Sequence, residues 1–184
     1  MPDIIAGAKG KMAHAVEFAQ EEFAAIRTGR AHPAMFSKLN ADYYGTSTPL
    51  QQLAGFQVPE ARTIIITPYD QGALAQIERA IRDSDLGVNP ANDGRAIRVV
   101  LPILTEERRN EYIKLARSKA EDGRVAIRNI RRHANDAVHK LVKEHQVGED
   151  EAKKAEKQLD GLTKKNVDAI DDLLERKEAE LREV

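Results

Sequence analysis

Apolar residues recur with helical spacing in three long stretches of the chain, and charged residues fill the positions between them. In residues 3–27 one apolar set recurs every seven residues, at Ile5, Met12, Ala19 and Ile26. This spacing places the set on one side of a helix. We predict that the helix closes at Gly29 in the left-handed conformation, before Pro33.

Two longer helices are predicted in the second half of the chain, over residues 105–146 and 149–182. Thr105 is the expected N-cap of the first. Its predicted apolar face comprises Tyr112, Leu115, Ala116, Ile127, Ile130, Ala134, Ala137 and Leu141. Helical patterns of this length indicate a coiled coil or an extended bundle. Three amphipathic helices bury their apolar faces against one another or against a partner chain, so we predict a three-helix bundle.

The middle of the chain has a different pattern, with short β-branched or alternating runs separated by turn residues. Strands are expected in residues 37–45, 62–67 and 95–102, a short helix in 72–85 and a turn in 87–95. This pattern predicts a small α/β domain of the β/α/β kind. The aromatic residues beside these strands fit core packing better than base stacking: Tyr43, Tyr44, Phe56 and Tyr69.

The predicted fold class is therefore α+β, with two domains. Residues 1–30 and 105–184 form the bundle, and residues 31–104 form the inserted α/β domain. The chain crosses between them twice, near Thr28–Arg30 and near Pro102–Leu104. We interpret the paired crossings as a hinge, made of Thr28, Gly29, Arg30, Pro102, Ile103 and Leu104.

Composition narrows the function classes. The chain has no cysteine, which excludes disulfides and thiolate metal sites. Neither a glycine-rich phosphate loop nor an HExxH motif occurs, so we expect no enzyme activity, no metal site and no cofactor. No apolar run approaches the length of a membrane span, and the N-terminus does not read as a signal peptide. A soluble cytoplasmic protein is expected.

Charge is unevenly distributed along a chain whose formal net charge is only -1. Residues 105–146 contain 11 basic and 7 acidic side chains, whereas residues 147–184 contain 8 and 12. On the second predicted helix, five arginines share one side, and we call them the basic stripe: Arg117, Arg124, Arg128, Arg131 and Arg132. Arginine is well suited to binding phosphate and to stacking on RNA bases. The alternative is a solvated face that the acidic third helix neutralises.

Several motifs resemble those of the bacterial ribosome recycling factor family, nearly from end to end. They are "IRTGRAHPAM", "YYGTSTPLQQLA", "SDLGVNP", "RVVLPILTEERR" and "AIRNIRRHAND", in this order. Two single positions depart from the usual family pattern, His32 where Ser is common and His133 where Asp is frequent. They leave the resemblance intact and affect only the local contacts.

The resemblance implies an L-shaped protein, similar in outline to a transfer RNA. It further implies a translation factor that binds the large ribosomal subunit after termination. With elongation factor G, which hydrolyses the nucleotide, it would split the ribosome and release it from mRNA. The motifs imply contacts to ribosomal RNA from Arg128, Arg131 and Arg132, with Arg124 and Arg117 of the same stripe, and further contacts near the elbow from Arg27, Arg30, Arg108 and Arg109. We expect a monomer; the alternative function is a coiled-coil scaffold without an RNA role.

Overall fold

The computed structural model describes residues 1–183 and divides the chain into two compact units. The first unit comprises Met1–Phe23 and Ile113–Ala179. The second comprises Ala24–Tyr112 and the C-terminal residues from Glu180 onward. The chain is therefore an α+β protein of two domains, in agreement with the predicted fold class. The domain limits at residues 30 and 105 stay a prediction.

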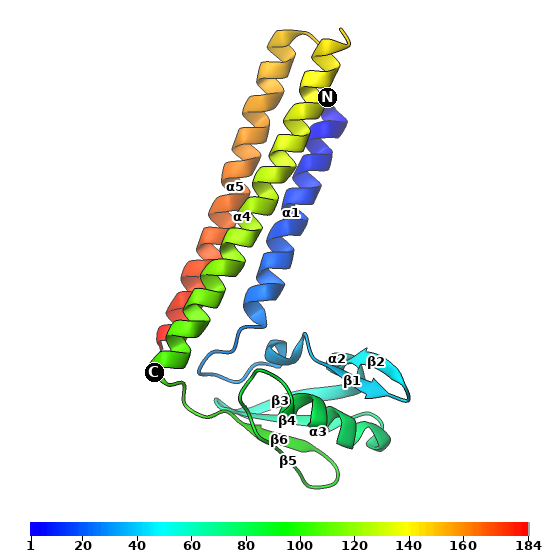
Figure 1. Cartoon of the computed structure of the whole chain (residues 1–184), viewed down its shortest axis with the longest axis vertical. Helices are drawn as coiled ribbons and strands as arrows, with labels where there is room; N and C mark the ends of the chain where they lie inside the picture. Colours follow the sequence, from blue (N-terminus) through cyan, green and yellow to red (C-terminus); the bar gives the residue numbers. More distant parts are fainter. Residues whose placement is uncertain (184) are drawn as a thin grey trace. The chain divides into compact units, whose positions relative to one another are not determined.

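The first unit is built from the greater part of three long helices that lie side by side (Figure 1). They are α1 (Pro2–Ala24), α4 (Glu106–Lys143) and α5 (Glu149–Arg182). Their apolar faces meet in a core of small and aliphatic side chains, which includes Ala8, Met12, Ala120, Ile127, Ala134, Val138, Ala152, Ala155, Leu159 and Ile170. The predicted apolar face of the second helix is wrong at Leu115, which is exposed, while Ile113 is buried.

The ends of the long helices confirm one predicted capping residue and contradict another. Thr105 is the N-cap of α4, because its Oγ1 accepts a hydrogen bond from the Arg108 backbone N–H at 3.2 Å. His145, with a φ of 57°, follows the end of α4. The prediction for Gly29 is wrong, because α1 ends earlier, at Ala24, and Gly29 is not among the described glycines with positive φ.

Gly123 lies inside α4, where glycine weakens a helix by about 1 kcal/mol relative to alanine. The structure explains its presence. A Cβ at this position would lie 2.7 Å from Ile170 Cδ1 of α5 and 3.5 Å from Ala19 Cβ of α1. Gly123 therefore marks the place where α4 packs closely against both other helices of the bundle.

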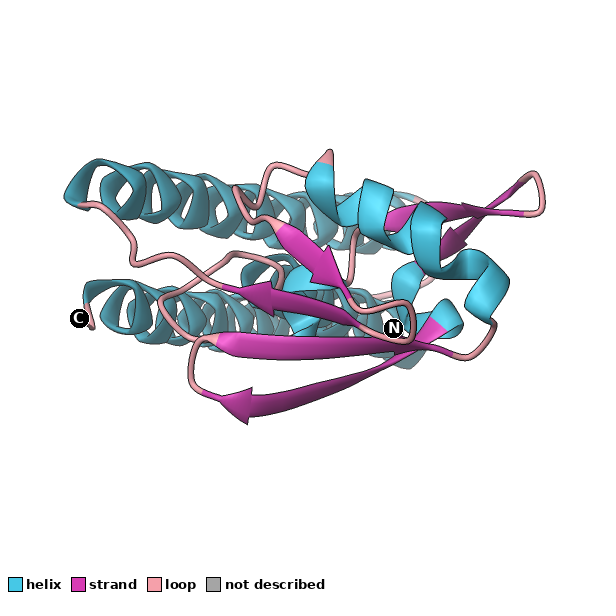
Figure 2. Ribbon diagram, turned by 90° about the horizontal axis from the view of Figure 1, so that it is seen from below, coloured by secondary structure: helices cyan, strands magenta, loops and turns pink. Residues whose placement is uncertain are grey.

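The second unit contains a four-stranded antiparallel sheet in the order β3-β4-β6-β5 (Figure 2). Its strands are β3 (Ala54–Glu60), β4 (Thr63–Pro68), β5 (Pro90–Asn92) and β6 (Ile97–Val100). A separate hairpin pairs β1 (Asn40–Tyr43) with β2 (Thr46–Pro49). The remaining elements are the helices α2 (Leu50–Leu53) and α3 (Leu74–Arg82) and the 3-10 turns η1 (Pro33–Phe36) and η2 (Gln71–Ala73).

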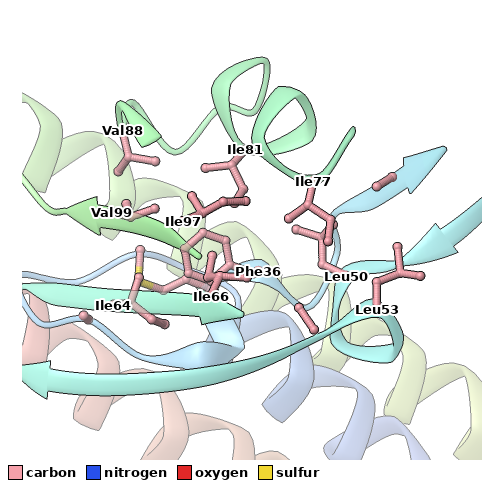
Figure 3. Packing of buried hydrophobic residues seen from close by; sticks show 14 of the residues in the cluster. Phe36, Leu50, Leu53, Ile64, Ile66, Ile77, Ile81, Val88, Ile97 and Val99 are labelled. Carbon is pink, nitrogen blue, oxygen red and sulfur yellow. The ribbon is translucent and has the colours of Figure 1, made fainter. Parts of the chain in front are cut away.

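One apolar core holds this unit together. Ile77 and Ile81 of α3 lie over the face of the sheet that carries Ile66 and Ile97 (Figure 3). Phe36 is fully buried in this core and stacks on the ring of Phe56, with the centroids 5.7 Å apart. Alternate residues of β6 are buried and exposed, and Ile97 and Val99 belong to this core.

Several details of the second unit differ from the predictions. The segment predicted as a turn over residues 87–95 contains the short edge strand β5, between Gly87 and Gly94, which both have positive φ. The strands β2 and β3 were not predicted. The prediction of core packing is wrong for Tyr44 and Tyr69, which are largely exposed.

Candidate nucleic-acid interface

The basic stripe lies on α4. Another face of the same helix is buried against α1 and α5. The buried residues of α4 are Ile113, Ala116, Ala120, Ile127, Ala134 and Val138. The five arginines lie outside this set, as the helical spacing predicts. The structure separates them into two groups that the sequence spacing does not distinguish.

Three arginines of the stripe lie along the seam with α5 and contact its carboxylates. Arg117 Nε donates to Glu178 Oε1 at 2.6 Å, and Arg124 Nε donates to Asp171 Oδ1 at 2.7 Å. Arg131 Nη1 lies 3.7 Å from Asp160 Oδ1, an ion pair without a hydrogen bond. The alternative in which the acidic third helix neutralises the stripe is therefore correct for part of it.

The seam pairs follow one antiparallel register, and that register is interrupted at Arg131. Seven residues forward on α4, from Arg117 to Arg124, correspond to seven residues backward on α5, from Glu178 to Asp171. The next step would place Lys164 opposite Arg131. Lys164 pairs instead with Asp168 of its own helix at 2.6 Å, and Arg131 contacts Asp160 further along. Arg131 thus has the weakest acidic partner of the three seam arginines.

The other two arginines of the stripe face away from the seam. Arg128 Nη1 donates to Glu121 Oε1 at 3.2 Å, within α4. Arg132 is exposed and makes no hydrogen bond or ion pair with any of residues 1–183. Arg132 therefore combines full charge with an unoccupied guanidinium donor set, which suits an external phosphate.

Glu121 is the one carboxylate of α4 that contacts the stripe. It accepts hydrogen bonds from Arg124 at 3.0 Å and from Arg128 at 3.2 Å. These bonds, with that of Arg124 first, lower the pKa of Glu121. The side chain of Glu121 is 53% exposed, so the pair lies at the surface.

The arginines predicted near the elbow all lie in the second unit, and they differ in exposure. Arg27 is only 5% exposed, and its guanidinium donates to the backbone carbonyl of Pro102. Burial lowers the pKa of Arg27, and the neighbouring Tyr112 opposes this shift. The position of Arg27 thus favours a structural role and disfavours the RNA contact that the motif implies.

Two other arginines of this group are more exposed than Arg27: Arg109 is half-buried and Arg30 is exposed. The Nε of Arg109 is buried, with no hydrogen-bond partner among the described atoms. Arg30 is exposed and lies 4.0 Å from Glu183, and its backbone N–H donates to Thr28 Oγ1 at 3.3 Å. Arg108 pairs with Glu111 at 3.5 Å.

The six predicted hinge residues also lie in the second unit. Ile103 is exposed, whereas Leu104 is buried. The bond from Arg27 to Pro102 ties the two crossing segments together, a contact between residues 75 positions apart. The sequence gives no signal for this bond, because it depends on the path of both segments in space.

Two departures from the family pattern now have a structural description. His32 caps η1, since its Nδ1 accepts a hydrogen bond from the Ala34 backbone N–H at 3.0 Å. His133 is exposed on α4. His32 thus fulfils the capping role that a serine performs at such a position.

A second surface feature lies between α1 and α4. Phe18 is 58% exposed and lines a groove of about 510 Å³. The groove is lined by Gly10, Lys11, His14, Ala15, Phe18 and Ile130.

Within residues 1–183, no cluster of three or more His, Asp or Glu side chains is arranged to hold a metal ion. Every helix in this part of the chain lacks the length or apolar character needed to cross a bilayer.

The sequence predicted the arginines but not their partners on α5. Asp160, Asp171 and Glu178 belong to an acidic helix, and that overall acidity was the only sign of a neutralising role. The seven-residue spacing of Asp171 and Glu178, which repeats that of Arg117 and Arg124, is the signal that identifies them in retrospect.

Comparisons with known proteins agree with the resemblance of the motifs. A family model described as "Ribosome recycling factor" matches residues 19–181. A ribosome-recycling factor of Cutibacterium acnes is 61% identical over 184 residues, which is 100% of both chains. That of Kocuria rhizophila is 60% identical over 179 residues, covering 97% of each chain, and that of Nocardioides sp. is 63% identical over 182 residues, covering 99% and 98%.

Two solved structures have the same fold. A solution structure of the ribosome recycling factor has a TM-score of 0.77 and 42% identity, covering 100% of this chain and 97% of that one. A second has a TM-score of 0.69 and 44% identity, covering 98% and 97%. It is described as models for the T. thermophilus ribosome recycling factor and the E. coli elongation factor G bound to the E. coli post-termination complex.

Proposed function

The chain belongs to the ribosome recycling factor family, and we propose that it binds the large ribosomal subunit after termination and, with elongation factor G, splits the ribosome and releases it from mRNA. It is a translation factor, and its function is ribosome recycling. The relative described on a post-termination complex with elongation factor G supports the choice of partner. The family membership favours this function over a scaffold without an RNA role.

The proposed contact with ribosomal RNA centres on Arg132, Arg128 and Arg131 of α4. The observation that carries this proposal is the guanidinium of Arg132, exposed and without a partner among residues 1–183. Arg128 and Arg131 flank it, each with one weak acidic contact, at 3.2 Å and 3.7 Å. Three arginines within five residues can bind phosphate groups through charge-assisted hydrogen bonds.

The remaining arginines have graded roles in this proposal. Arg117 and Arg124 are held by α5 carboxylates at hydrogen-bond distance, so they contribute mainly long-range positive potential. Arg30 and Arg109 are secondary candidates for RNA contact, and Arg27 is the weakest because its guanidinium is buried. The protein acts as a monomer in the cytoplasm, has no catalytic residue and leaves nucleotide hydrolysis to its partner.

We further propose that Thr28, Gly29, Arg30, Pro102, Ile103 and Leu104 form a hinge. Two short crossings allow rotation about an axis and restrict other movement. The bond from Arg27 to Pro102 couples the crossings, so they would move as a pair. Since Gly29 does not require a left-handed conformation, its replacement by an ordinary residue would not by itself strain the hinge.

The test is binding of the full chain to isolated large ribosomal subunits by co-sedimentation at several salt concentrations. Arg132→Ala should weaken binding about tenfold or more, because charge-assisted hydrogen bonds contribute about 1.5–3 kcal/mol. The same variant should reduce the slope of log affinity against log salt by about 1. Arg117→Ala should have a smaller effect, because Arg117 is committed to Glu178.

The matched control is Arg176→Ala, which removes an exposed arginine from α5 outside the seam. It changes the net charge by the same amount and should bind nearly as the unmodified chain does. Equal weakening by Arg132→Ala and Arg176→Ala would mean that net charge, and not the stripe, governs binding. Normal binding by a folded Arg132→Ala variant would refute the assigned surface.

A further inference from the structure

Glu121 places a negative charge inside the surface that the proposed function assigns to RNA. Its two carboxylate oxygens receive hydrogen bonds from two arginines of the stripe, Arg124 and Arg128. An exposed carboxylate beside a phosphate-binding arginine repels the RNA backbone and so opposes binding.

The two arginines differ in what else they contact. Arg124 is also bonded to Asp171 of α5 at 2.7 Å, and its side chain is only 20% exposed. Arg128 has no partner other than Glu121 among residues 1–183, and half of its side chain is exposed. Glu121 therefore controls chiefly the availability of Arg128, while Arg124 stays attached to α5 whether or not Glu121 is charged.

We infer that Glu121 is an intramolecular competitor of RNA phosphate for the guanidinium of Arg128. This inference rests on the proposed RNA-binding role of the stripe. In the free protein the Glu121 carboxylate accepts a hydrogen bond from Nη1 of Arg128. Binding exchanges this contact for a phosphate oxygen and leaves the ionised carboxylate beside the RNA backbone, which weakens the complex. A factor that must leave the ribosome after each round benefits from such a limit on affinity.

Charge on Glu121 is the variable to change. Glu121→Gln keeps the shape of the side chain and removes the charge that competes with phosphate. Because exposed ion pairs are weak, the variant should bind isolated large ribosomal subunits about two- to fivefold more tightly. The gain should appear mainly as slower dissociation, since affinity differences among variants of one interface reside mostly in the dissociation rate.

Two further variants separate competition from a general change of charge. Asp122→Asn removes the same charge from the next residue of α4, whose carboxylate acts on Lys119 and not on the stripe, and it should leave affinity nearly unchanged. Glu121→Gln is also made in an Arg128→Ala background. If Glu121 acts by holding Arg128, the tightening should be largely lost there. A generic effect of charge would persist.

Arg132→Ala is measured in the same series, so that the two proposals can fail separately. Weakened binding by Arg132→Ala together with tightening by Glu121→Gln that needs Arg128 supports the inference. Weakened binding by Arg132→Ala without tightening by Glu121→Gln, or with equal tightening by Asp122→Asn, overturns the competitor and leaves the surface in place. Normal binding by Arg132→Ala removes the surface, and the competitor with it.

Discussion

Gly123 permits the sharpest test of how the bundle is packed. Replacing it with alanine adds one methyl group inside α4, and by helix propensity alone the protein should gain about 1 kcal/mol. The structure opposes this gain. The new Cβ would lie 2.7 Å from Ile170 Cδ1, roughly 1 Å inside the usual contact distance between two carbon atoms.

Ile170 has little room to move, because it is fully buried between the helices. Forcing an extra methyl group into a packed core costs about 1–3 kcal/mol. The loss offsets or exceeds the propensity gain, so Gly123→Ala should lower the free energy of unfolding by about 0–2 kcal/mol. The control is Gly161→Ala, at an α5 position where no atom lies within 4 Å of an added Cβ. It should stabilise the protein by about 1 kcal/mol.

A double-mutant cycle identifies the contact. Ile170→Val removes Cδ1 and alone costs about 0.5–1.5 kcal/mol. Combined with Gly123→Ala it removes the clash, so the double variant should be more stable than the two single effects predict, by about 1–2 kcal/mol. Urea unfolding followed by far-ultraviolet circular dichroism gives all the values. If Gly123→Ala stabilises the chain as much as Gly161→Ala and shows no coupling to Ile170→Val, the packing argument fails.

Two other predictions concern the second unit. The bonds to Asp70, first from the Gly72 backbone N–H and then from Tyr43 Oη, lower the pKa of its carboxyl. Its contribution to stability is therefore present above the ordinary carboxyl pKa of about 3.9 and is lost as pH falls through the lower folded value. Asp70→Asn should therefore reduce the fall in the free energy of unfolding at acid pH. An unchanged fall in this variant would contradict the prediction. Arg27→Gln should cost about 1–3 kcal/mol by disrupting the buried bond to Pro102, with an unchanged salt slope of ribosome binding. A lower slope at normal stability would instead place Arg27 on the RNA.

The long helices and the family could be recognised from the sequence because their signals are local. Apolar spacing identified α1, α4 and α5, and Thr105 marked the start of α4. The β-branched run at residues 62–67 identified β4, which is buried in the sheet. In each case residues within a few positions of one another determine the backbone conformation and the side that is buried.

Predictions from the local sequence were wrong where the conformation depends on residues far apart in the chain. The strand β5 has three residues and begins with Pro90, so its pairing with β6 outweighs a sequence typical of turns. Gly29 could adopt the left-handed conformation, but the chain does not require it there. The exposure of Tyr44 and Tyr69 could not be predicted, because the local pattern does not specify which aromatic ring the core can accommodate.

The same division applies to the basic stripe. The sequence by itself determined that five arginines share one side of α4, because a helix repeats every 3.6 residues. Only the tertiary structure decided which of them are available, because Glu178 lies 61 positions from Arg117 and Asp171 lies 47 positions from Arg124. The register of two packed helices brings these charges within 3 Å, and no local pattern encodes that register. Arg132 is exposed and makes no hydrogen bond or ion pair within residues 1–183.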